Sequence, residues 1–424
     1  MSLKKLSNEI DFEPDKEESE FLKKETKKFL EILNHHVRKN KIDADVFVGG
    51  SFAKGTVAKS KDYDVDIFVR FDLKYSDLSK LLEKIMNGVS KEIGIEFLRV
   101  HGSRDYFNIE KTKKLTFEII PVLRIKKVKE AQNVTDLSYF HVKYIKKSSE
   151  GKQKEILLAK KFFKAQKFYG AESYIQGFSG YSLECLIVNF GSFEKMLKAL
   201  VKIKDKLILD PAKHYKKKND VFFELNESKL QGPIILVDPT GKERNVLAAL
   251  SDEMFKKFQA VAQKFLKNPS RDFFELIETK ENSFRKLAVK KNAEFVKIIL
   301  ESDRQEGDIA GTKMKKFVKF LKRAIGQYFE ILESDFEYCG SGKISEVYFV
   351  VKSKKKIARK GPPIGMMKAV KDFKKKNKKA YEKNGSLWVD VNVESSVKKY
   401  LKDLWNSERK RSAAMSIKNL EIIS

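Results

Sequence analysis

Cysteine is scarce in this 424-residue sequence, which contains only Cys185 and Cys339. The two are far apart and have no histidine pattern near them, so we exclude a zinc site and a disulfide framework and interpret both as buried thiols. Long apolar runs are also missing, because no stretch approaches the roughly 20 residues of a membrane-spanning helix. The first residues lack the apolar core of a signal peptide. We therefore expect a cytoplasmic protein with no membrane partner.

Acidic residues are fewer than basic residues in this sequence. The chain carries 88 Lys and Arg against 59 Asp and Glu, which gives a formal net charge of +29. Such a balance favours a polyanionic partner, nucleic acid first, with an anionic membrane as the rival. A hydrophobic content of 42% is enough for packed cores, and the length is two or three times that of a usual domain. We predict a globular protein of several domains.

The apolar periodicity divides the chain into an α/β start, a helical middle and a mixed end. The first part has predicted helices at residues 17–39 and 76–91 and predicted strands at residues 46–48, 64–71 and 115–125. Helical spacing dominates the second part. The remaining predictions are helical regions at residues 136–168 and 181–201, helices at 254–266 and 314–332, strands at 347–351 and 387–393, and an exposed lysine-rich helix at 371–383. The fold class is therefore α+β and multidomain.

A pair of aspartates is the first candidate for chemistry. Asp64 and Asp66 stand two positions apart on a predicted strand, so both carboxylates lie on one face of it. Mg²⁺ prefers such oxygen ligands together with phosphates and water, which makes a nucleoside triphosphate the natural co-ligand. An Asp-x-Asp pair taken alone is more often only a surface feature.

Glu118 is the candidate for a third carboxylate. It lies in the apolar run Leu115-Thr-Phe-Glu-Ile-Ile-Pro-Val122, where burying an isolated carboxylate is costly unless a cation pairs with it. A two-metal mechanism for nucleotidyl transfer usually needs such a third acid. The alternative is a solvated glutamate at the edge of a sheet.

The turn before the aspartates is suited to phosphate. Gly50 and Ser51 offer backbone N–H groups and a hydroxyl, and Lys54 adds a positive charge. We reject a P-loop because Thr56 follows Gly55 where that motif requires lysine. We also reject a hydrolase nucleophile elbow, since Ala53 occupies its last glycine position.

Gly50-Ser51 followed by Asp64-Val-Asp66, with an acid on a later strand, resembles the signature of the polymerase-β-type nucleotidyltransferases. Further motifs narrow the resemblance to the archaeal CCA-adding enzymes, because they follow one another in that family's order. These motifs are Asp136-Leu-Ser-Tyr-Phe-His141, Lys160, Tyr169-Gly-Ala-Glu172, Gly177-Phe-Ser-Gly-Tyr181, Val237-Asp-Pro-Thr240, Arg244-Asn-Val246 and Gly361-Pro-Pro363. Two departures are Glu118, where Asp is more usual, and Ile-Gly-Met-Met after Pro363.

The resemblance implies a catalytic head at residues 1–145, a mainly helical neck at 146–265, and an α+β body and tail at 266–424. It implies that CTP and ATP supply C, C and A to the 3′ end of tRNA, which is held at its acceptor stem and elbow; it also admits a homodimer. Asp64, Asp66 and Glu118 would hold two Mg²⁺ ions. The implied contacts to the incoming nucleotide are Gly50, Ser51, Lys54, His141, Lys160, Tyr169 and Arg244.

Arg244 is the candidate for base selection. Its guanidinium has only donors, whereas N3 of cytosine and N1 of adenine are acceptors, and the matching nitrogens of uracil and guanine carry hydrogens. One arginine would thus accept C and A and reject U and G. Two alternatives stay open: another terminal transferase that makes poly(A), uridylyl or oligoadenylate products, or a non-catalytic RNA-binding protein. All three acidic positions are filled, which disfavours the second.

Overall fold

The computed structural model describes residues 6, 8–275, 280–392 and 396–423. The chain separates into two compact units, Met1–Leu276 and Ile277–Ser424. The finer division into head, neck, body and tail at residues 145 and 265 stays a prediction. Within the described residues, every helix is too short or too polar to cross a bilayer.

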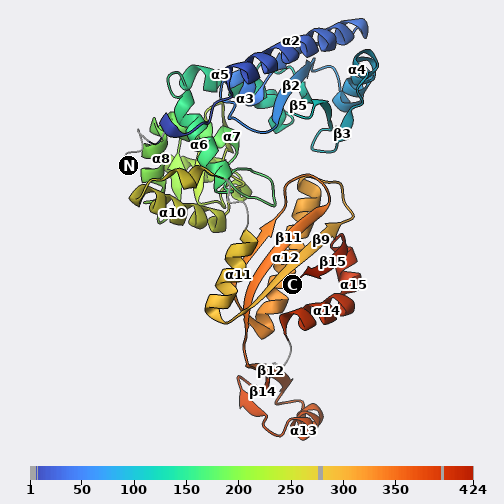
Figure 1. Ribbon diagram of the computed structural model, residues 1–424, viewed down its shortest axis with the longest axis vertical. Helices are drawn as coiled ribbons and strands as arrows, with labels where there is room; N and C mark the ends of the chain where they lie inside the picture. Colours follow the sequence, from blue (N-terminus) through green and yellow to red (C-terminus); the bar gives the residue numbers. More distant parts are fainter. Residues whose placement is uncertain (1–5, 7, 276–279, 393–395, 424) are drawn as a thin grey trace. The chain divides into compact units, whose positions relative to one another are not determined.

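A five-stranded sheet forms the start of the first unit (Figure 1). Its strand order is β1-β2-β5-β4-β3, and only the central pair, β2 and β5, is parallel. The strands are β1 Ala44–Val48, β2 Tyr63–Phe71, β3 Leu98–Val100, β4 Tyr106–Thr112 and β5 Leu115–Leu123. The three strands predicted in this part of the chain are present, and the third ends at Leu123, two residues before its predicted end.

Two helices cover one face of this sheet and leave the other for the site. They are α2 (Lys16–Lys39) and α4 (Leu78–Ile93), which pack on the alternate apolar residues Val65, Ile67 and Val69 of β2. In the same core, the rings of Phe29 and Phe117 stack with their centroids 4.3 Å apart. Because side chains alternate along a strand, Asp64 and Asp66, which alternate with these residues, point to the opposite face.

The rest of the first unit is mainly helical, as predicted. A core rich in phenylalanine holds its helices together, with Phe162, Phe163 and Phe258 fully buried. The elements are α5 Ser138–Ser148, α6 Gln153–Ala165, α7 Gly180–Phe190, α8 Phe193–Leu200, α9 Val221–Glu224 and α10 Asp252–Lys267. A small sheet of β6 Leu207–Leu209, β7 Ile234–Asp238 and β8 Gly241–Asn245 completes the unit.

The second unit has a sheet between helices. The sheet order is β10-β11-β9-β15; α12 and α14 contribute to the core on one face, and α11 to a smaller cluster that includes Tyr348 and Val350 of β11. A separate sheet has the order β12-β14-β13 and is accompanied by α13. The bounds are α11 Lys280–Lys291, β9 Glu294–Ser302, α12 Asp308–Tyr328, β10 Phe329–Glu337, β11 Ile344–Ser353, β12 Lys356–Pro363, α13 Met367–Lys376, β13 Tyr381–Lys383, β14 Ser386–Asn392, α14 Val397–Ser407, α15 Arg409–Ala414 and β15 Ile417–Ile423.

Three expectations for the second unit are wrong in part. The helix predicted at 314–332 ends at Tyr328, because Phe329 begins β10 and pairs with β11. The lysine-rich helix ends at Lys376, where Asn377 caps it by donating its backbone and side-chain N–H groups to the Phe373 carbonyl. Cys339 is exposed, because it lies in the turn after β10; only Cys185 is buried. Val393, the end of the strand predicted at 387–393, lies outside the described residues.

Candidate active site

Three carboxylates share the open face of the first sheet. Asp64 and Asp66 lie on β2, on the side opposite the residues that pack against α2 and α4. In the parallel pairing of β2 with β5, Asp66 is the register partner of Glu118. Registered residues on neighbouring strands point to the same face, so the three predicted acids come together.

The charges of these acids act on one another. Burial raises the pKa of Glu118 to about 7, with Asp66 and then Asp64 adding repulsion. Burial also raises the pKa of Asp66, where Lys54 opposes the shift and Asp64 adds to it. Carboxylates held in this way are stabilised by a nearby cation.

The donor set fits a magnesium ion. Hard carboxylate oxygens on adjacent strands are the ligands that Mg²⁺ takes together with phosphate oxygens and water. Among the described residues, no three His, Cys, Asp or Glu side chains are already closed around a metal position. Such sites depend on substrate phosphate for part of their coordination, so an open set of acids is consistent with this chemistry.

The glycine turn lies directly against the second aspartate. Gly49 donates its backbone N–H to the carbonyl of Asp66 at 2.8 Å. Gly50 has a φ of +54°, and a Cβ at this position would overlap the Asp66 carboxylate. Residue 50 must therefore be glycine for two reasons: its positive φ favours glycine, and the Asp66 carboxylate leaves no room for a Cβ atom. Ser51 and Lys54 follow in the short helix α3 (Gly50–Lys54).

A buried glutamate holds the two predicted phosphate-binding lysines. Glu184 on α7 is fully buried and accepts hydrogen bonds from Lys54 Nζ at 2.6 Å and Lys160 Nζ at 2.9 Å. Thr56 donates its hydroxyl to the same carboxylate at 2.7 Å. Lys160 also donates to the Thr56 carbonyl at 3.0 Å and is only 3% exposed. In this structure Lys160 therefore binds the loop after α3.

Tyr169 lies beside these lysines. A Cβ on Gly180 would come within 2.6 Å of the Tyr169 hydroxyl and 3.8 Å of Lys160 Cε, so both side chains reach the start of α7. Lys164 Nζ lies 5.1 Å from the centre of the Tyr169 ring. Burial raises the pKa of Tyr169, with Glu184 and Asp66 adding to the shift.

A second polar group surrounds Asp238, at the end of β7. Its carboxylate accepts hydrogen bonds from Arg244 Nη1 at 2.7 Å and from the Tyr181 hydroxyl at 3.0 Å, and it lies 3.1 Å from His141 Nε2. The His141 ring stacks on Tyr181 with centroids 4.0 Å apart. The Arg244 side chain is 30% exposed, whereas Asp238 is fully buried.

Tyr181 joins the two groups. Lys54 Nζ and Arg244 Cζ each lie 5.9 Å from the centre of its ring. Tyr181 and Glu184 are three positions apart on α7, which places them on one side of that helix. The unit thus combines an acidic face, a pair of lysines and a partly open arginine in one region.

Comparisons with known proteins identify the family. A nucleotidyltransferase domain matches residues 26–167, and the second domain of tRNA nucleotidyltransferase matches residues 154–275. The CCA-adding enzyme of Nanoarchaeum equitans is 39% identical over 61% of this chain and 63% of that protein. That of Saccharolobus solfataricus is 32% identical over 72% of this chain and 69% of that protein. The chain belongs to the archaeal CCA-adding enzymes.

A more distant relative aligns over more of the chain. The CCA-adding enzyme of Thermococcus kodakarensis is 25% identical over 89% of this chain and 82% of that protein. Among solved structures, the Cid1 RNA terminal uridylyl transferase is similar with a TM-score of 0.50 at 11% identity; the match covers 65% of this chain and 97% of that one. The fold is that of the polymerase-β-type nucleotidyltransferases. As a member of the CCA-adding family, the chain is a tRNA nucleotidyltransferase that uses nucleoside triphosphates and a divalent metal ion.

Glu184 and Asp238 were not among the site residues predicted from the sequence. Both are fully buried acids that bind the predicted cationic residues. A signal for Glu184 was present, because it is the one charged residue of the apolar helix GYSLECLIVNF. Asp238 stood inside a motif that was noticed only for its order in the chain.

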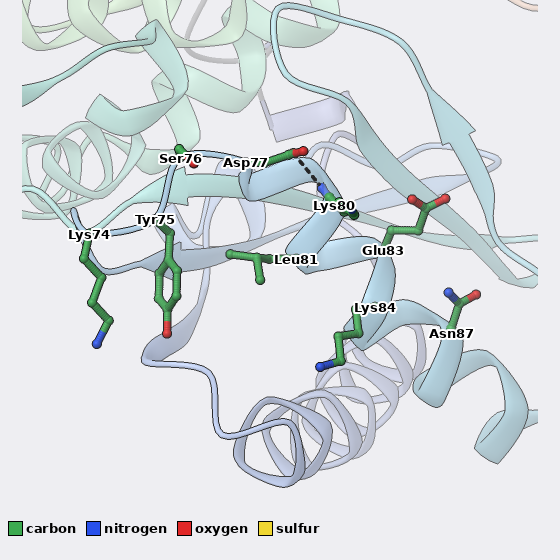
Figure 2. Close-up of a pocket in the computed structure, with 9 residues that line it drawn as sticks. All are labelled: Lys74, Tyr75, Ser76, Asp77, Lys80, Leu81, Glu83, Lys84 and Asn87. Atoms are coloured by element: carbon green, nitrogen blue, oxygen red, sulfur yellow. Dashed lines mark hydrogen bonds between the residues drawn. The ribbon is translucent and has the colours of Figure 1, made fainter.

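A hollow elsewhere on the first unit contains none of the predicted site residues. It has a volume of about 550 Å³ and lies at the start of α4 (Figure 2). Lys74, Tyr75, Lys80 and Lys84 are among its lining residues, and Asp77 there accepts the backbone N–H of Lys80 at 3.0 Å. The hollow offers no acid pair comparable with the β2–β5 face, so we do not assign catalysis to it.

Proposed function

We propose that this chain adds C, C and A in order to the 3′ end of tRNA, from CTP and ATP and without a nucleic-acid template. Each step would join the 3′ hydroxyl of the RNA to the α-phosphate of the nucleotide and release pyrophosphate. The observation that carries the proposal is the pairing of Asp66 with Glu118 on the same unit as the Asp238-bound Arg244. The acidic pair is suited to bind metal ions and phosphate, and Arg244 is suited to bind a nucleotide base.

Asp64, Asp66 and Glu118 are our proposed ligands for two Mg²⁺ ions. When bound, such ions activate the attacking hydroxyl and stabilise the leaving pyrophosphate oxygens. The raised pKa values of Glu118 and Asp66 support this role. Burial and mutual repulsion destabilise the ionised carboxylates, and a bound cation would stabilise them. The difference between Glu118 and the more usual Asp is one methylene, which a small shift of the strand accommodates.

The triphosphate would lie on the turn at Gly50 and Ser51. Their backbone N–H groups, the Ser51 hydroxyl and Lys54 offer donors and a positive charge. The Lys54 side chain is 9% exposed, and its ammonium pairs with Glu184 and opposes the rise in the pKa of Asp66. We include Lys160, Tyr169 and His141 as nucleotide contacts by resemblance, with Lys160 also acting through the loop that it binds.

Arg244 would select the base. Nη1 of its guanidinium donates to Asp238, which holds the arginine in place. Among the described residues, no hydrogen bond uses Nε or Nη2, so these two donors remain for a ligand. These donors match N3 of cytosine and N1 of adenine. His141 is an aromatic surface next to them, stacked on Tyr181.

Arg244→Ala is expected to relax base choice more than it slows the reaction. The preference for CTP over UTP should fall by about one to two orders of magnitude, the scale of losing one specific hydrogen-bonding partner. Single-nucleotide incorporation with each of the four triphosphates measures this. Arg271→Ala, at an exposed arginine of the same unit, is the matched control. Unchanged discrimination against UTP would remove Arg244 from the proposal.

The second unit would bind the acceptor stem and elbow of tRNA. A groove of about 520 Å³ is lined by Lys316, Lys319, Arg323 and Arg411, with Arg411 4.5 Å above the Phe320 ring. Several lysines near α13 add charge: Lys371, Lys374, Lys375, Lys376, Lys378 and Lys379. The described residues that line the groove include no acid, and such a cluster of cations neutralises phosphates. A homodimer rests on the resemblance alone.

Purified protein, Mg²⁺ and tRNA that lacks its 3′ CCA provide the test of function. With CTP alone we expect two added C residues, and with CTP and ATP together we expect one further A, because the product then ends in CCA. Product length and sequence are the readout, and tRNA that already ends in CCA is the control. Long A or U tails would favour another terminal transferase, and no incorporation would favour a binding protein.

A further inference from the structure

An exposed pair of phenylalanines interrupts the surface of the first unit. Phe222 is 43% exposed and Phe223 is 88% exposed. They belong to α9, whose other apolar residue, Val221, is fully buried and packs with Leu225, Ile235 and Val237. The buried side fixes the helix, so the two rings are held outward and are not part of a core.

Four exposed lysines precede these rings: Lys213, Lys216, Lys217 and Lys218. The two acids of the same segment already have partners. Asp220 accepts the backbone N–H of Lys217 at 3.1 Å, and Glu224 pairs with Lys242. Within the described part of the chain, none of the four lysine ammonium groups forms an ion pair with these acids, and all four lysines are exposed, so their charges can meet an outside anion. We call residues 213–224 the lysine–phenylalanine surface.

This surface is attached to the hairpin that carries the base-selecting arginine. The Tyr215 hydroxyl donates to the Lys242 carbonyl at 2.7 Å, and the His214 ring lies 3.1 Å from the Pro239 carbonyl. Lys242 is two residues before Arg244 on β8. Segment and hairpin thus form one piece with Asp238 and Arg244.

We propose that the lysine–phenylalanine surface binds the unpaired 3′ end of the RNA substrate, next to the site where the new nucleotide is selected. Exposed aromatic rings stack on unpaired bases, and neighbouring lysines bind the phosphates between them; this combination is typical of single-strand binding. A duplex hides its base faces, so it would leave the two rings without a partner. The four exposed lysines disfavour a second copy of this basic chain, because like charges would meet. The inference rests on the proposed function.

Phe223→Ala tests the contact without disturbing the core, since that ring is almost fully exposed. We expect KM for tRNA lacking CCA to rise about tenfold, within the range for losing one stacked base, while KM for CTP stays unchanged. A tRNA with 2-aminopurine as its last base should show fluorescence quenching on the wild type and much less on the variant. Lys216→Glu, Lys217→Glu and Lys218→Glu combined should weaken binding further and reduce its dependence on salt.

Matched controls lie outside this surface. Val289→Ala removes an equally exposed apolar side chain (84% exposed) from the second unit, and Lys23→Glu, Lys24→Glu and Lys27→Glu combined reverse three exposed charges on α2. Both should retain the wild-type KM for tRNA. If the wild type adds CCA but Phe223→Ala keeps its KM and quenching, the inference fails and the proposed function stands. A change in oligomeric state of Phe223→Ala by light scattering, without a change in KM, would overturn it in favour of self-association.

Discussion

Asp66→Ala is expected to reduce nucleotide incorporation by at least about a thousandfold, beyond the loss typical of one electrostatic group in an active site. Asp66 is central in the acidic face, since it is the register partner of Glu118 and contacts the turn at Gly50. Its removal takes away a proposed metal ligand. Single-turnover incorporation of labelled CTP into tRNA lacking CCA measures the effect, and filter binding measures tRNA affinity, which should stay nearly unchanged.

A control variant and a stability measurement complete this test. Asp62→Ala removes an exposed acid just before the same strand and should keep wild-type turnover. Stability should not fall in Asp66→Ala through loss of charge, because burial already raises the pKa of this carboxyl and disfavours its ionised form. Wild-type turnover in Asp66→Ala would contradict the assignment of Asp66 as a metal ligand.

Glu184→Ala is expected to lower the free energy of unfolding by about 3–5 kcal/mol, the range for removing one partner of a buried ion pair. The variant leaves Lys160 buried and Lys54 close to it without their counter-ion. Urea denaturation measures the loss. Glu194→Ala, which breaks the exposed pair with Lys198 on α8, is the matched control and should cost less than about 1 kcal/mol.

The same residue makes stability depend on pH. Burial alone would raise the pKa of Glu184, but Lys160 and Lys54 outweigh it and hold that pKa at about 2, below the ordinary value of 4.5. A carboxyl with a depressed pKa contributes stability that is present above its unfolded pKa and is lost as pH falls toward its folded pKa. The contribution should therefore disappear between about pH 4.5 and 2, and Glu184→Gln should flatten this part of the profile. An equally steep fall in Glu184→Gln would contradict the assignment.

The sequence predicted the acidic face well because it depends on a period of two. Asp64 and Asp66 alternate with buried valine and isoleucine, so their common face follows from local geometry. The pairing with Glu118 needed the parallel neighbour β5, which lies about fifty residues later and is set by tertiary packing. That prediction came from the need of a third acid and from the resemblance.

Other features depended on contacts that no local pattern reveals. Lys160 was predicted to bind phosphate, yet in the described structure its ammonium is satisfied by Glu184 and Thr56, residues from two other segments. The end of α12 at Tyr328 was missed because the apolar spacing continues into β10, where pairing with β11 overrides it. Helix existence was easier to predict than helix ends.

Helix α7 has a consequence for attempts to change which nucleotides are added. Its Tyr181 contacts the hairpin residue Asp238, and one turn further on its Glu184 binds the two lysines. If Arg244 and the lysine pair have the roles that we propose, a substitution that shifts this helix would disturb nucleotide choice and catalytic rate together. Attempts to change nucleotide choice alone should therefore target the β7–β8 hairpin, which carries Arg244, and leave α7, which contacts both groups, unchanged.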